Sequence, residues 1–133
     1  MWGEQLEFRT FERRDLNDVI GLCKAERWES YVVDPERTYR ALSAPGVITV
    51  VAVEKGKVLG FAQSLTDGAI RAYLANMVVL TSKRGSGIGR RLVQEVLARS
   101  KAVYIDLLST DGSDAFYEKF PHHRFPGYRL YSK

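Results

Sequence analysis

The chain lacks several features that would assign it to a particular class of protein. It has a single cysteine, Cys23, so no intrachain disulfide can form, and this is typical of a protein of the reducing cytoplasm. No apolar run is long enough to span a bilayer, and residues 1–5 resemble neither the cationic nor the apolar part of a signal peptide. Repeats, linkers and low-complexity tracts are also absent. We therefore expect one cytoplasmic domain over residues 1–133, with no membrane partner.

A glycine-rich stretch at residues 84–89, with the sequence RGSGIG, matches neither of two common phosphate-binding motifs. Arg90 stands where the fingerprint G-x-G-x-x-G needs its third glycine, and no Gly-Lys-Ser/Thr closes the run as in a P-loop. The stretch still lies between an apolar run, residues 77–80, and an amphipathic segment, residues 88–97. A strand, a glycine turn and a helix in this order present bare N–H groups and a positive helix end to an anion. We expect a phosphate there, although such a turn can also bind nothing.

Cationic side chains flank this turn at Lys83, Arg84, Arg90 and Arg91. Positive charge is unfavourable beside a helix N-terminus, so the cluster itself indicates a bound anion. The formal net charge is +4, but elsewhere the charges alternate in sign and form no basic stripe. This distribution favours a coenzyme with several phosphates over nucleic acid.

Two motifs together resemble one family. Arg84, Gly87 and Gly89 form Arg-x-x-Gly-x-Gly, which, with the strand before it, resembles the pyrophosphate-binding signature of the GCN5-related N-acetyltransferases (GNAT). Residues 116–120, with the sequence FYEKF, resemble the later F-Y-E-K motif of that family. The resemblance implies an enzyme that moves an acetyl group from acetyl-coenzyme A (acetyl-CoA) to a primary amine, without a metal. The alternative is an acyl-CoA-binding module that has lost catalysis.

Hydrophobic periodicity predicts an α+β fold, and the resemblance implies the GNAT arrangement of a mixed, mostly antiparallel sheet with helices on both faces. Strands are expected at residues 6–11, 47–53, 58–65, 70–80, 103–108 and, after a turn, in the segment 125–131. Helices are expected after Asp15, after Asp34-Pro35, over 88–97, and from a cap at Asp111 or Ser113 through Phe120. The run 70–80 is long enough to hold a bulge. The strand at 103–108, which follows the crossover helix, should be parallel to the strand at 70–80.

The resemblance implies a coenzyme site built mostly from backbone. N–H groups from Arg84 to Arg90 would face the pyrophosphate, and the Arg84 guanidinium would add a charge-assisted contact. The N–H of Val78 or Val79 would donate to the thioester oxygen, with the pantetheine arm in a gap beside the strand. The implied coenzyme-binding residues are Met77, Val78, Val79, Arg84, Gly85, Ser86, Gly87, Ile88, Gly89 and Arg90.

Tyr117 occupies the tyrosine position of the F-Y-E-K motif, where the resemblance implies a general acid for the leaving thiolate. A phenol of pKa about 10 protonates a thiolate whose conjugate acid has a pKa of about 8.5 only with help from the site. Many relatives carry a glutamate base on the strand before the glycine turn, but residues 73–76 (YLAN) offer no carboxylate. The open candidates for a base are Tyr73 or Asn76 through a water, and Glu29, Tyr31 or Asp34.

The loop at residues 28–34 is the expected wall of the acceptor site. Glu29 could attract a cationic amine, and Trp28 or Tyr31 could stack on it. The expected substrate-binding residues are Glu29, Tyr31 and Tyr73. A plain exposed loop with a cap at Asp34 is the alternative, and the sequence leaves open whether the amine belongs to a small molecule or a protein.

Three further interpretations complete the expectations. Cys23 falls on the apolar face of a helix and should be core. His122 and His123 are adjacent and cannot easily chelate one ion, so a solvated loop is favoured over a metal site. Exposed strands at the sheet edge are compatible with a homodimer.

Overall fold

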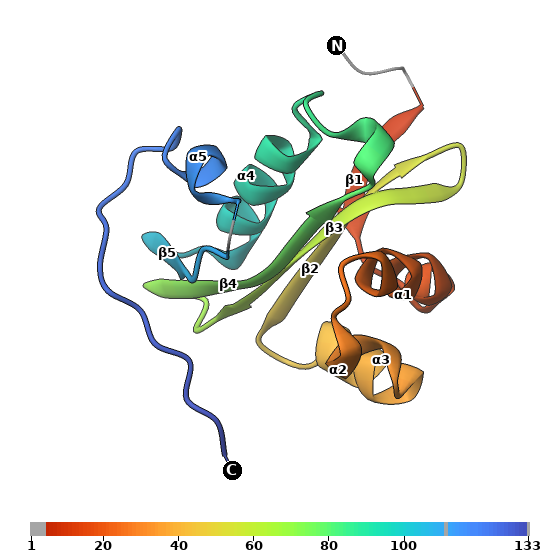
Figure 1. The fold of residues 1–133 in the computed structure, drawn as a ribbon, viewed down its shortest axis with the longest axis horizontal. Helices are drawn as coiled ribbons and strands as arrows, with labels where there is room; N and C mark the ends of the chain where they lie inside the picture. The colour runs from red at the N-terminus through yellow and green to blue at the C-terminus, as the bar shows by residue number, and fades with distance from the viewer. Residues whose placement is uncertain (1–4, 111, 133) are drawn as a thin grey trace.

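A five-stranded sheet in the order β1-β2-β3-β4-β5 forms the centre of the computed structural model, which describes residues 5–110 and 112–132 (Figure 1). Its strands are β1 (Leu6–Thr10), β2 (Val47–Glu54), β3 (Lys57–Thr66), β4 (Arg71–Val79) and β5 (Tyr104–Leu107). The first four pair antiparallel, and β4 pairs parallel with β5. The mixed, mostly antiparallel sheet is therefore confirmed.

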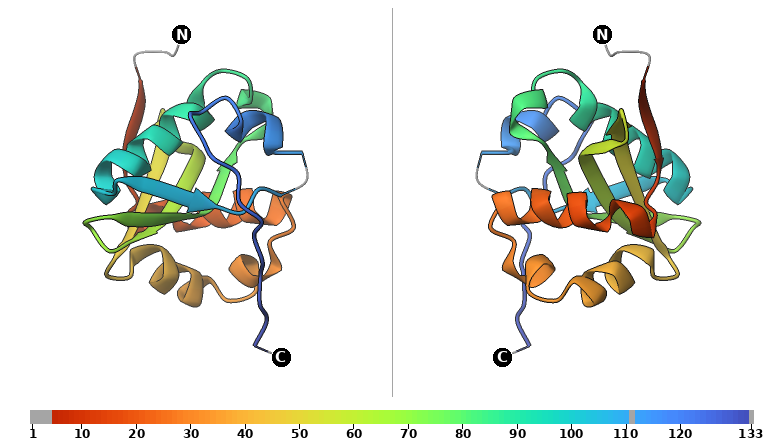
Figure 2. Two further views of the ribbon diagram at one scale, coloured as in Figure 1. Left: turned by 90° about the vertical axis from the view of Figure 1, so that its left-hand side faces the viewer. Right: turned by 90° about the vertical axis from the view of Figure 1, so that its right-hand side faces the viewer.

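Helices cover both faces of the sheet (Figures 1 and 2). One face carries α1 (Leu16–Ala25), α2 (Glu29–Val32) and α3 (Pro35–Ser43), and the other carries α4 (Ile88–Ser100) and α5 (Asp114–Tyr117). Two 3-10 turns, η1 (Arg13–Asp15) and η2 (Thr81–Lys83), precede α1 and the glycine turn. Each face has its own core, because successive strand side chains point in opposite directions. Val51 and Val53 of β2 pack with α1, whereas Val50 and Ala52 pack beneath α4.

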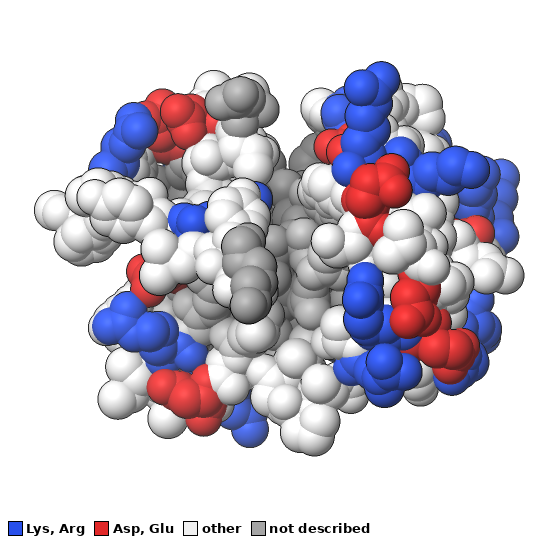
Figure 3. Space-filling model, turned by 60° about the horizontal axis from the view of Figure 1, so that its bottom comes forward, with Lys and Arg blue, Asp and Glu red and all other residues white. Residues whose placement is uncertain are grey.

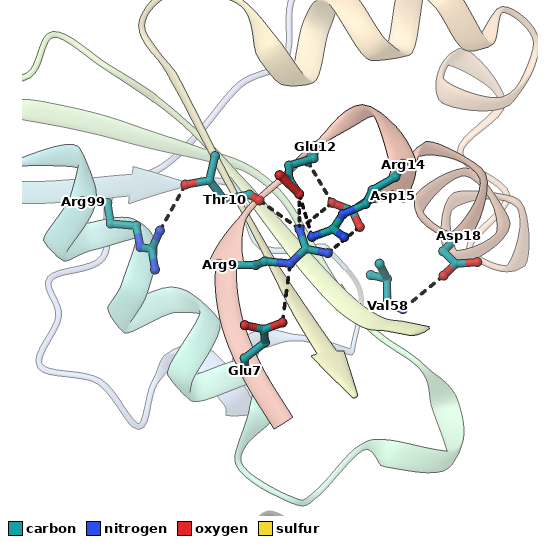
Figure 4. A network of polar contacts seen from close by, with 9 residues as sticks. All are labelled: Glu7, Arg9, Thr10, Glu12, Arg14, Asp15, Asp18, Val58 and Arg99. Atoms are coloured by element: carbon teal, nitrogen blue, oxygen red, sulfur yellow. Dashed lines mark hydrogen bonds and ion pairs between the residues drawn. The ribbon is translucent and has the colours of Figure 1, made fainter. Parts of the chain in front are cut away.

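Two aspartates precede helices, and they act differently. The Asp34 carboxylate accepts a hydrogen bond from the Arg37 N–H at 3.2 Å, which confirms the expected cap before Pro35. Asp15 also precedes α1, but its side chain makes no cap bond there. Its carboxylate instead accepts two hydrogen bonds from the Arg9 guanidinium, both at 2.8 Å, and one from the Glu12 N–H (Figure 4). Asp15 therefore ties β1 to the start of α1.

The expected last strand in the segment 125–131 is wrong. Residues 121–132 form neither helix nor strand and run as an exposed tail past the end of β5 (Figures 1 and 2). A strand needs the backbone of a partner, and the tail makes no ladder with the described part of the chain. The helix before the tail also ends early, at Tyr117 rather than Phe120. Ser113 is its N-cap residue without a side-chain cap bond, and Asp111 lies outside the described residues.

No helix in the described ranges is both long enough and apolar enough to cross a membrane.

Candidate functional site

A cleft of about 1100 Å³ opens where β4 and β5 separate. The two strands pair only from Arg71 opposite Tyr104 to Leu74 opposite Leu107, whereas β4 continues to Val79. Beyond Leu74 the β5-facing edge of β4 is therefore open. The cleft is also lined by the glycine turn, α5 and the segment that joins α1 to α2.

The open part of β4 begins with a bulge. Gln63 of β3 lies opposite Asn76, but the next residue, Ser64, lies opposite Leu74, so Ala75 is extra. An extra residue bends its strand and increases the local twist. The bulge expected within residues 70–80 is thus confirmed, and it stands where the two parallel strands part.

The hydrogen-bond alternation of β3 and β4 decides which backbone groups of β4 face the cleft. The Leu80 N–H donates to the Leu59 carbonyl at 2.7 Å, and the register then pairs Gly60 with Val79 and Phe61 with Val78. Directly opposite residues in an antiparallel pair alternate between bonded and non-bonded pairs. The backbone groups of Val78 therefore point toward β3. Those of Met77 and Val79 point toward the open edge, which favours Val79 over Val78 as a donor to a ligand.

The glycine turn leaves a row of N–H groups without protein acceptors. Gly85 and Gly87 have φ values of +82° and +92°, which favour glycine, and Gly87 is the N-cap of α4. The first helical hydrogen bond of α4 is donated by the Arg91 N–H to the Gly87 carbonyl at 3.1 Å. Within the described chain, no acceptor is found for the N–H groups of Gly85, Gly87, Ile88, Gly89 and Arg90. A helix N-terminus of this kind is suited to an anion.

Eight of the ten expected coenzyme residues line the cleft: Met77, Val78, Val79, Arg84, Gly85, Gly87, Gly89 and Arg90. Ser86 and Ile88 do not. The Ser86 hydroxyl donates to the Lys83 carbonyl at 2.6 Å, and the Ile88 side chain points from the first turn of α4 into the apolar core. Ile88 can therefore meet a ligand only through its backbone.

The four cations around the turn all have protein partners, so the explanation of the cluster by a bound anion needs revision. Lys83 pairs with Glu54 at 3.5 Å, Arg84 with Glu26 at 2.9 Å and Arg91 with Glu95 at 2.7 Å, while Arg90 lies over the Phe120 ring at 4.8 Å. Internal ion pairs explain much of this charge. The stronger indication of an anion site is the row of unbonded N–H groups.

The short helix α5 packs directly on the glycine turn. A Cβ at Gly89 would lie 3.3 Å from the ring of Phe116, so glycine here admits an aromatic side chain as well as a ligand. The next residue, Tyr117, lines the cleft, and burial raises the pKa of its phenol. Its hydroxyl makes no hydrogen bond within residues 5–110 and 112–132. Tyr117 therefore offers a neutral O–H to the cleft.

The opposite wall of the cleft holds a network of three neutral polar side chains. The Tyr31 hydroxyl on α2 donates to the side-chain amide oxygen Oε1 of Gln63 at 3.1 Å. The amide of Asn76 donates to the same oxygen at 2.8 Å and also to the Tyr31 hydroxyl. Burial raises the pKa of Tyr31, so the phenol stays protonated near neutral pH. The network joins the helix α2 to the residue that follows the bulge.

The sequence did not predict a role for Gln63, although the residue is 4% exposed and its side chain accepts hydrogen bonds from both Tyr31 and Asn76. The available signal was a glutamine inside the otherwise apolar strand around Phe61-Ala62. Glu26 was also missed, because its partner Arg84 is remote in sequence. A single glutamate that follows a helix gives no sequence signal that it will pair with a distant arginine.

The remaining candidates divide between the cleft and its surroundings. Glu29, Tyr31, Tyr73, Asn76 and Trp28 line the cleft, whereas Asp34 does not and serves as the cap of α3. Cys23 is fully buried, as expected, and burial raises the pKa of its thiol to about 12. Among the described residues, no group of three or more His, Cys, Asp or Glu side chains could hold a metal ion.

Several solved structures are similar to this fold over nearly the whole chain. An acetyltransferase from Trypanosoma brucei is 27% identical with a TM-score of 0.71, and the match covers 94% of this chain and 99% of that one. A ribosomal-protein-alanine N-acetyltransferase from Brucella melitensis biovar Abortus 2308 is 15% identical with a TM-score of 0.78, covering 96% and 99%. AAC(6')-Iy, in complex with the bisubstrate analog CoA-S-monomethyl-acetylneamine, is 18% identical with a TM-score of 0.73, covering 96% and 97%.

No curated protein sequence gives a significant match to the chain. The family model of the acetyltransferase (GNAT) domain, however, matches residues 45–120, which is more than half of the chain. This range contains β2 to β5, the glycine turn, α4 and α5, and so it includes most of the cleft. The chain belongs to the GNAT acetyltransferase family.

Proposed function

We propose that the protein transfers an acetyl group from acetyl-CoA to a primary amine in a ternary complex. The observation that carries this proposal is the continuity of two sets of backbone groups. The unbonded N–H groups of the glycine turn lead directly onto the open edge of β4 at Val79 and Met77. A ligand with a diphosphate at one end and amide groups along an extended arm matches both.

The residues present suit the coenzyme. The pyrophosphate would be held by the N–H groups of Gly85, Gly87, Ile88, Gly89 and Arg90 at the start of α4. The pantetheine amides would pair with the outward backbone groups of Met77 and with the Val79 N–H, in the place of a neighbouring strand, while the Val79 carbonyl is bonded to Arg84. One of these N–H groups would donate to the thioester oxygen, and the loss of a comparable donor costs about 2.7–4 kcal/mol.

The reaction would join the amine nitrogen to the acetyl carbonyl carbon and break the carbon–sulfur bond. Tyr117 would give its proton to the departing thiolate, because its phenol is kept protonated by burial and lies in the cleft. The amine would lose its proton to a water held by Tyr31 or Asn76, or would arrive already neutral. Tyr73 and Glu29 line the same cleft and remain alternatives for this step.

The acceptor is proposed only as a primary amine. Trp28, Tyr31 and Tyr73 supply aromatic surface at the acceptor end, and Glu29 supplies one negative charge. Acidic and basic side chains are interspersed over the face shown in Figure 3, and this supports a coenzyme rather than nucleic acid as the anionic ligand. We place the reaction in the cytoplasm because the single, buried cysteine suits a reducing compartment.

The proposal is tested first by binding. The change in melting temperature should be compared among acetyl-CoA, CoA, NAD and ATP, because a ligand at about a hundred times its Kd stabilises a protein by about 2.7 kcal/mol. We expect stabilisation by acetyl-CoA and CoA well above that by NAD or ATP. A panel of amines with thiol detection then tests turnover. Binding without turnover on any amine would favour the alternative, an acyl-CoA-binding module.

A further inference from the structure

Gln63 and Asn76 form a directly opposite pair across β3 and β4, beside the bulge. Opposite residues of antiparallel strands have their side chains on the same face of the sheet. Here that face is the one covered by α2, since both side chains contact the Tyr31 hydroxyl. Asn76 lines the cleft, whereas Gln63 is buried. The amide of Asn76 therefore stands between a buried amide and the space in which an acceptor would bind.

The direction of the Gln63 amide is set by a main-chain group that can only accept. Its Nε2 donates to the Ala41 carbonyl oxygen at 3.2 Å. A carbonyl oxygen cannot donate a hydrogen bond, so the reversed amide would bring two acceptors together. The Oε1 atom of Gln63 must therefore face Tyr31 and Asn76.

The direction of the Asn76 amide follows from that of Gln63. Its Nδ2 donates to Gln63 Oε1 at 2.8 Å and also to the Tyr31 hydroxyl, which itself donates to Gln63. Both hydrogens of the Asn76 amide are thereby used. Because its oxygen, Oδ1, accepts no hydrogen bond from the described residues and yet is not buried, this oxygen is open to the cleft.

An oxygen in this position suits the attacking nitrogen of an amine. A neutral primary amine has two N–H donors and one lone pair, and the lone pair must stay free to attack the thioester carbon. An acceptor that binds one N–H leaves the lone pair free, whereas the NH₂ group of a reversed amide would occupy it. Asn76 also directly precedes Met77, whose backbone faces the open edge of β4 where the thioester would lie.

The proposed acid stands on the other side of this edge. Tyr117 packs against the apolar cluster beneath α4, whereas Tyr31, which contacts Asn76, packs against the cluster on the α1 face. An acetyl group at the edge of β4 would thus have Asn76 on one side and Tyr117 on the other. The incoming nitrogen and the departing sulfur would use different walls of the cleft.

We propose that Asn76 Oδ1 accepts a hydrogen bond from the attacking amine and that Gln63 holds this oxygen toward the cleft. The inference rests on the proposed function and goes further, because it assigns the contact that orients the acceptor. An amide oxygen binds an N–H without removing its proton, so Asn76 orients the amine and is not itself the base. Gln63 acts through Asn76 and is a positioning residue.

The direction of the amide is tested first, in the natural chain and without a coenzyme. Asn17 and Asn76 are the only two asparagines, and Asn17 is exposed on α1, so asparagine labelled with ¹⁵N gives one amide to test and one reference. NMR then measures the exchange of the side-chain amide protons with water. We expect exchange at least about tenfold slower for Asn76, because both of its protons are hydrogen-bonded. Equal exchange would place the NH₂ group in the cleft and overturn the proposal.

The role of Gln63 is tested by the same measurement on Gln63→Leu. Without the Oε1 acceptor, the exchange rate of the Asn76 amide should rise toward that of Asn17, and kcat/KM for the amine should fall with it. A merely structural role of Gln63 would leave the exchange of Asn76 unchanged, and that result would overturn the positioning role.

Kinetics test the contact with the amine, using the member of the amine panel that the natural chain acetylates fastest. Asn76→Ala should lower kcat/KM for this amine by about tenfold or more, while the Kd of acetyl-CoA changes by less than about twofold. Thr38→Val is the matched control, because the buried Thr38 hydroxyl donates to the Tyr31 carbonyl at 2.6 Å but lies outside the cleft. Its kcat/KM should stay within about twofold of the natural value. An equal loss in both variants would contradict a specific role of Asn76.

Failure of the proposed function gives a different result from failure of this contact. If acetyl-CoA does not bind, or if the natural chain acetylates no amine, the proposed function and the contact are both wrong. Normal turnover of the amine by Asn76→Ala would overturn the contact alone.

Discussion

Arg84 reaches back to Val79: its Nε donates a hydrogen bond to the Val79 carbonyl oxygen at 2.8 Å. One of its terminal nitrogens also contacts the carboxylate of Glu26 at 2.9 Å. A single guanidinium thus joins the end of β4, the glycine turn and the segment after α1, which are three walls of the cleft. The arginine of the motif connects these walls, and the proposed anion site consists of backbone N–H groups.

Replacing Arg84 with lysine should therefore loosen the turn while the charge is kept. A lysine cannot reproduce the two-sided contact of a planar guanidinium. We expect a loss of about 1 kcal/mol in the free energy of unfolding, since half-exposed charged contacts are worth little more. Urea denaturation measures this loss. Arg124→Lys is the control, because Arg124 forms an exposed ion pair with Glu118. Its free energy of unfolding should change by less than about 0.5 kcal/mol. Equal losses in both variants would contradict the role of Arg84.

Tyr117→Phe should remove the proposed acid while leaving the coenzyme bound. We expect kcat to fall by about 10²–10⁴-fold with little change in the Kd of acetyl-CoA. Burial raises the pKa of Tyr117 above its ordinary value of 10.0, so loss of its proton should reduce kcat only above that pH. Tyr104→Phe, in an exposed part of β5, is the control. Turnover unchanged by Tyr117→Phe would exclude this assignment.

Two glycine-to-alanine substitutions should have opposite effects on stability. A Cβ at Gly60 would lie 2.8 Å from the Val78 carbonyl oxygen, so Gly60→Ala should cost about 1–3 kcal/mol through overpacking. Gly21 lies in α1 with nothing within 4 Å of an added Cβ, so Gly21→Ala should add about 0.5–1 kcal/mol. Thermal unfolding should show a lower melting temperature for Gly60→Ala and a higher one for Gly21→Ala. An unchanged melting temperature for Gly60→Ala would contradict the close approach of β3 to β4 at this position.

Asp15→Asn should destabilise the junction of β1 and α1. Burial alone would raise the pKa of Asp15, but hydrogen bonds from Arg9 and the Glu12 N–H outweigh it and lower that pKa below the ordinary 3.8. A lowered folded-state pKa adds stability that is present above the unfolded value and is lost as pH falls through the folded one. At neutral pH the variant should lose about 1.5–3 kcal/mol. Below pH 3 the difference from the natural chain should shrink, and a constant difference would argue against an ionised Asp15.

Cys23 should be unreactive in the folded protein. Burial, with a smaller contribution from Glu26, raises the pKa of its thiol to about 12, and the side chain is inaccessible. At pH 8 an alkylating reagent should modify the chain at least several-fold more slowly without denaturant than with it. Mass spectrometry of the modified chain measures this ratio. Rapid labelling of the native protein would indicate that α1 opens readily.

Much of the fold was predictable because its signals are local. The apolar runs of residues 47–53 and 58–65, the cap at Asp34 and the glycine turn each act over a few residues, and all of them are found where expected. The cleft was predictable in outline, since the family motif fixes which strand precedes the turn.

What failed depends on partners that are distant in sequence. The segment 125–131 has the composition of a strand but no partner within its own described chain. The Asp15 carboxylate bonds to Arg9 rather than the helix it precedes, and the cations of the turn are paired by Glu26, Glu54 and Glu95.

The sequence by itself determined most of the elements, their order and the glycine turn that we propose as the anion site, because glycine conformation and hydrophobic period are properties of neighbouring residues. Only the tertiary structure decided that Met77 and Val79, and not Val78, turn their N–H groups to the cleft. That outcome depends on the register between β3 and β4, and a register is set by packing across the whole sheet.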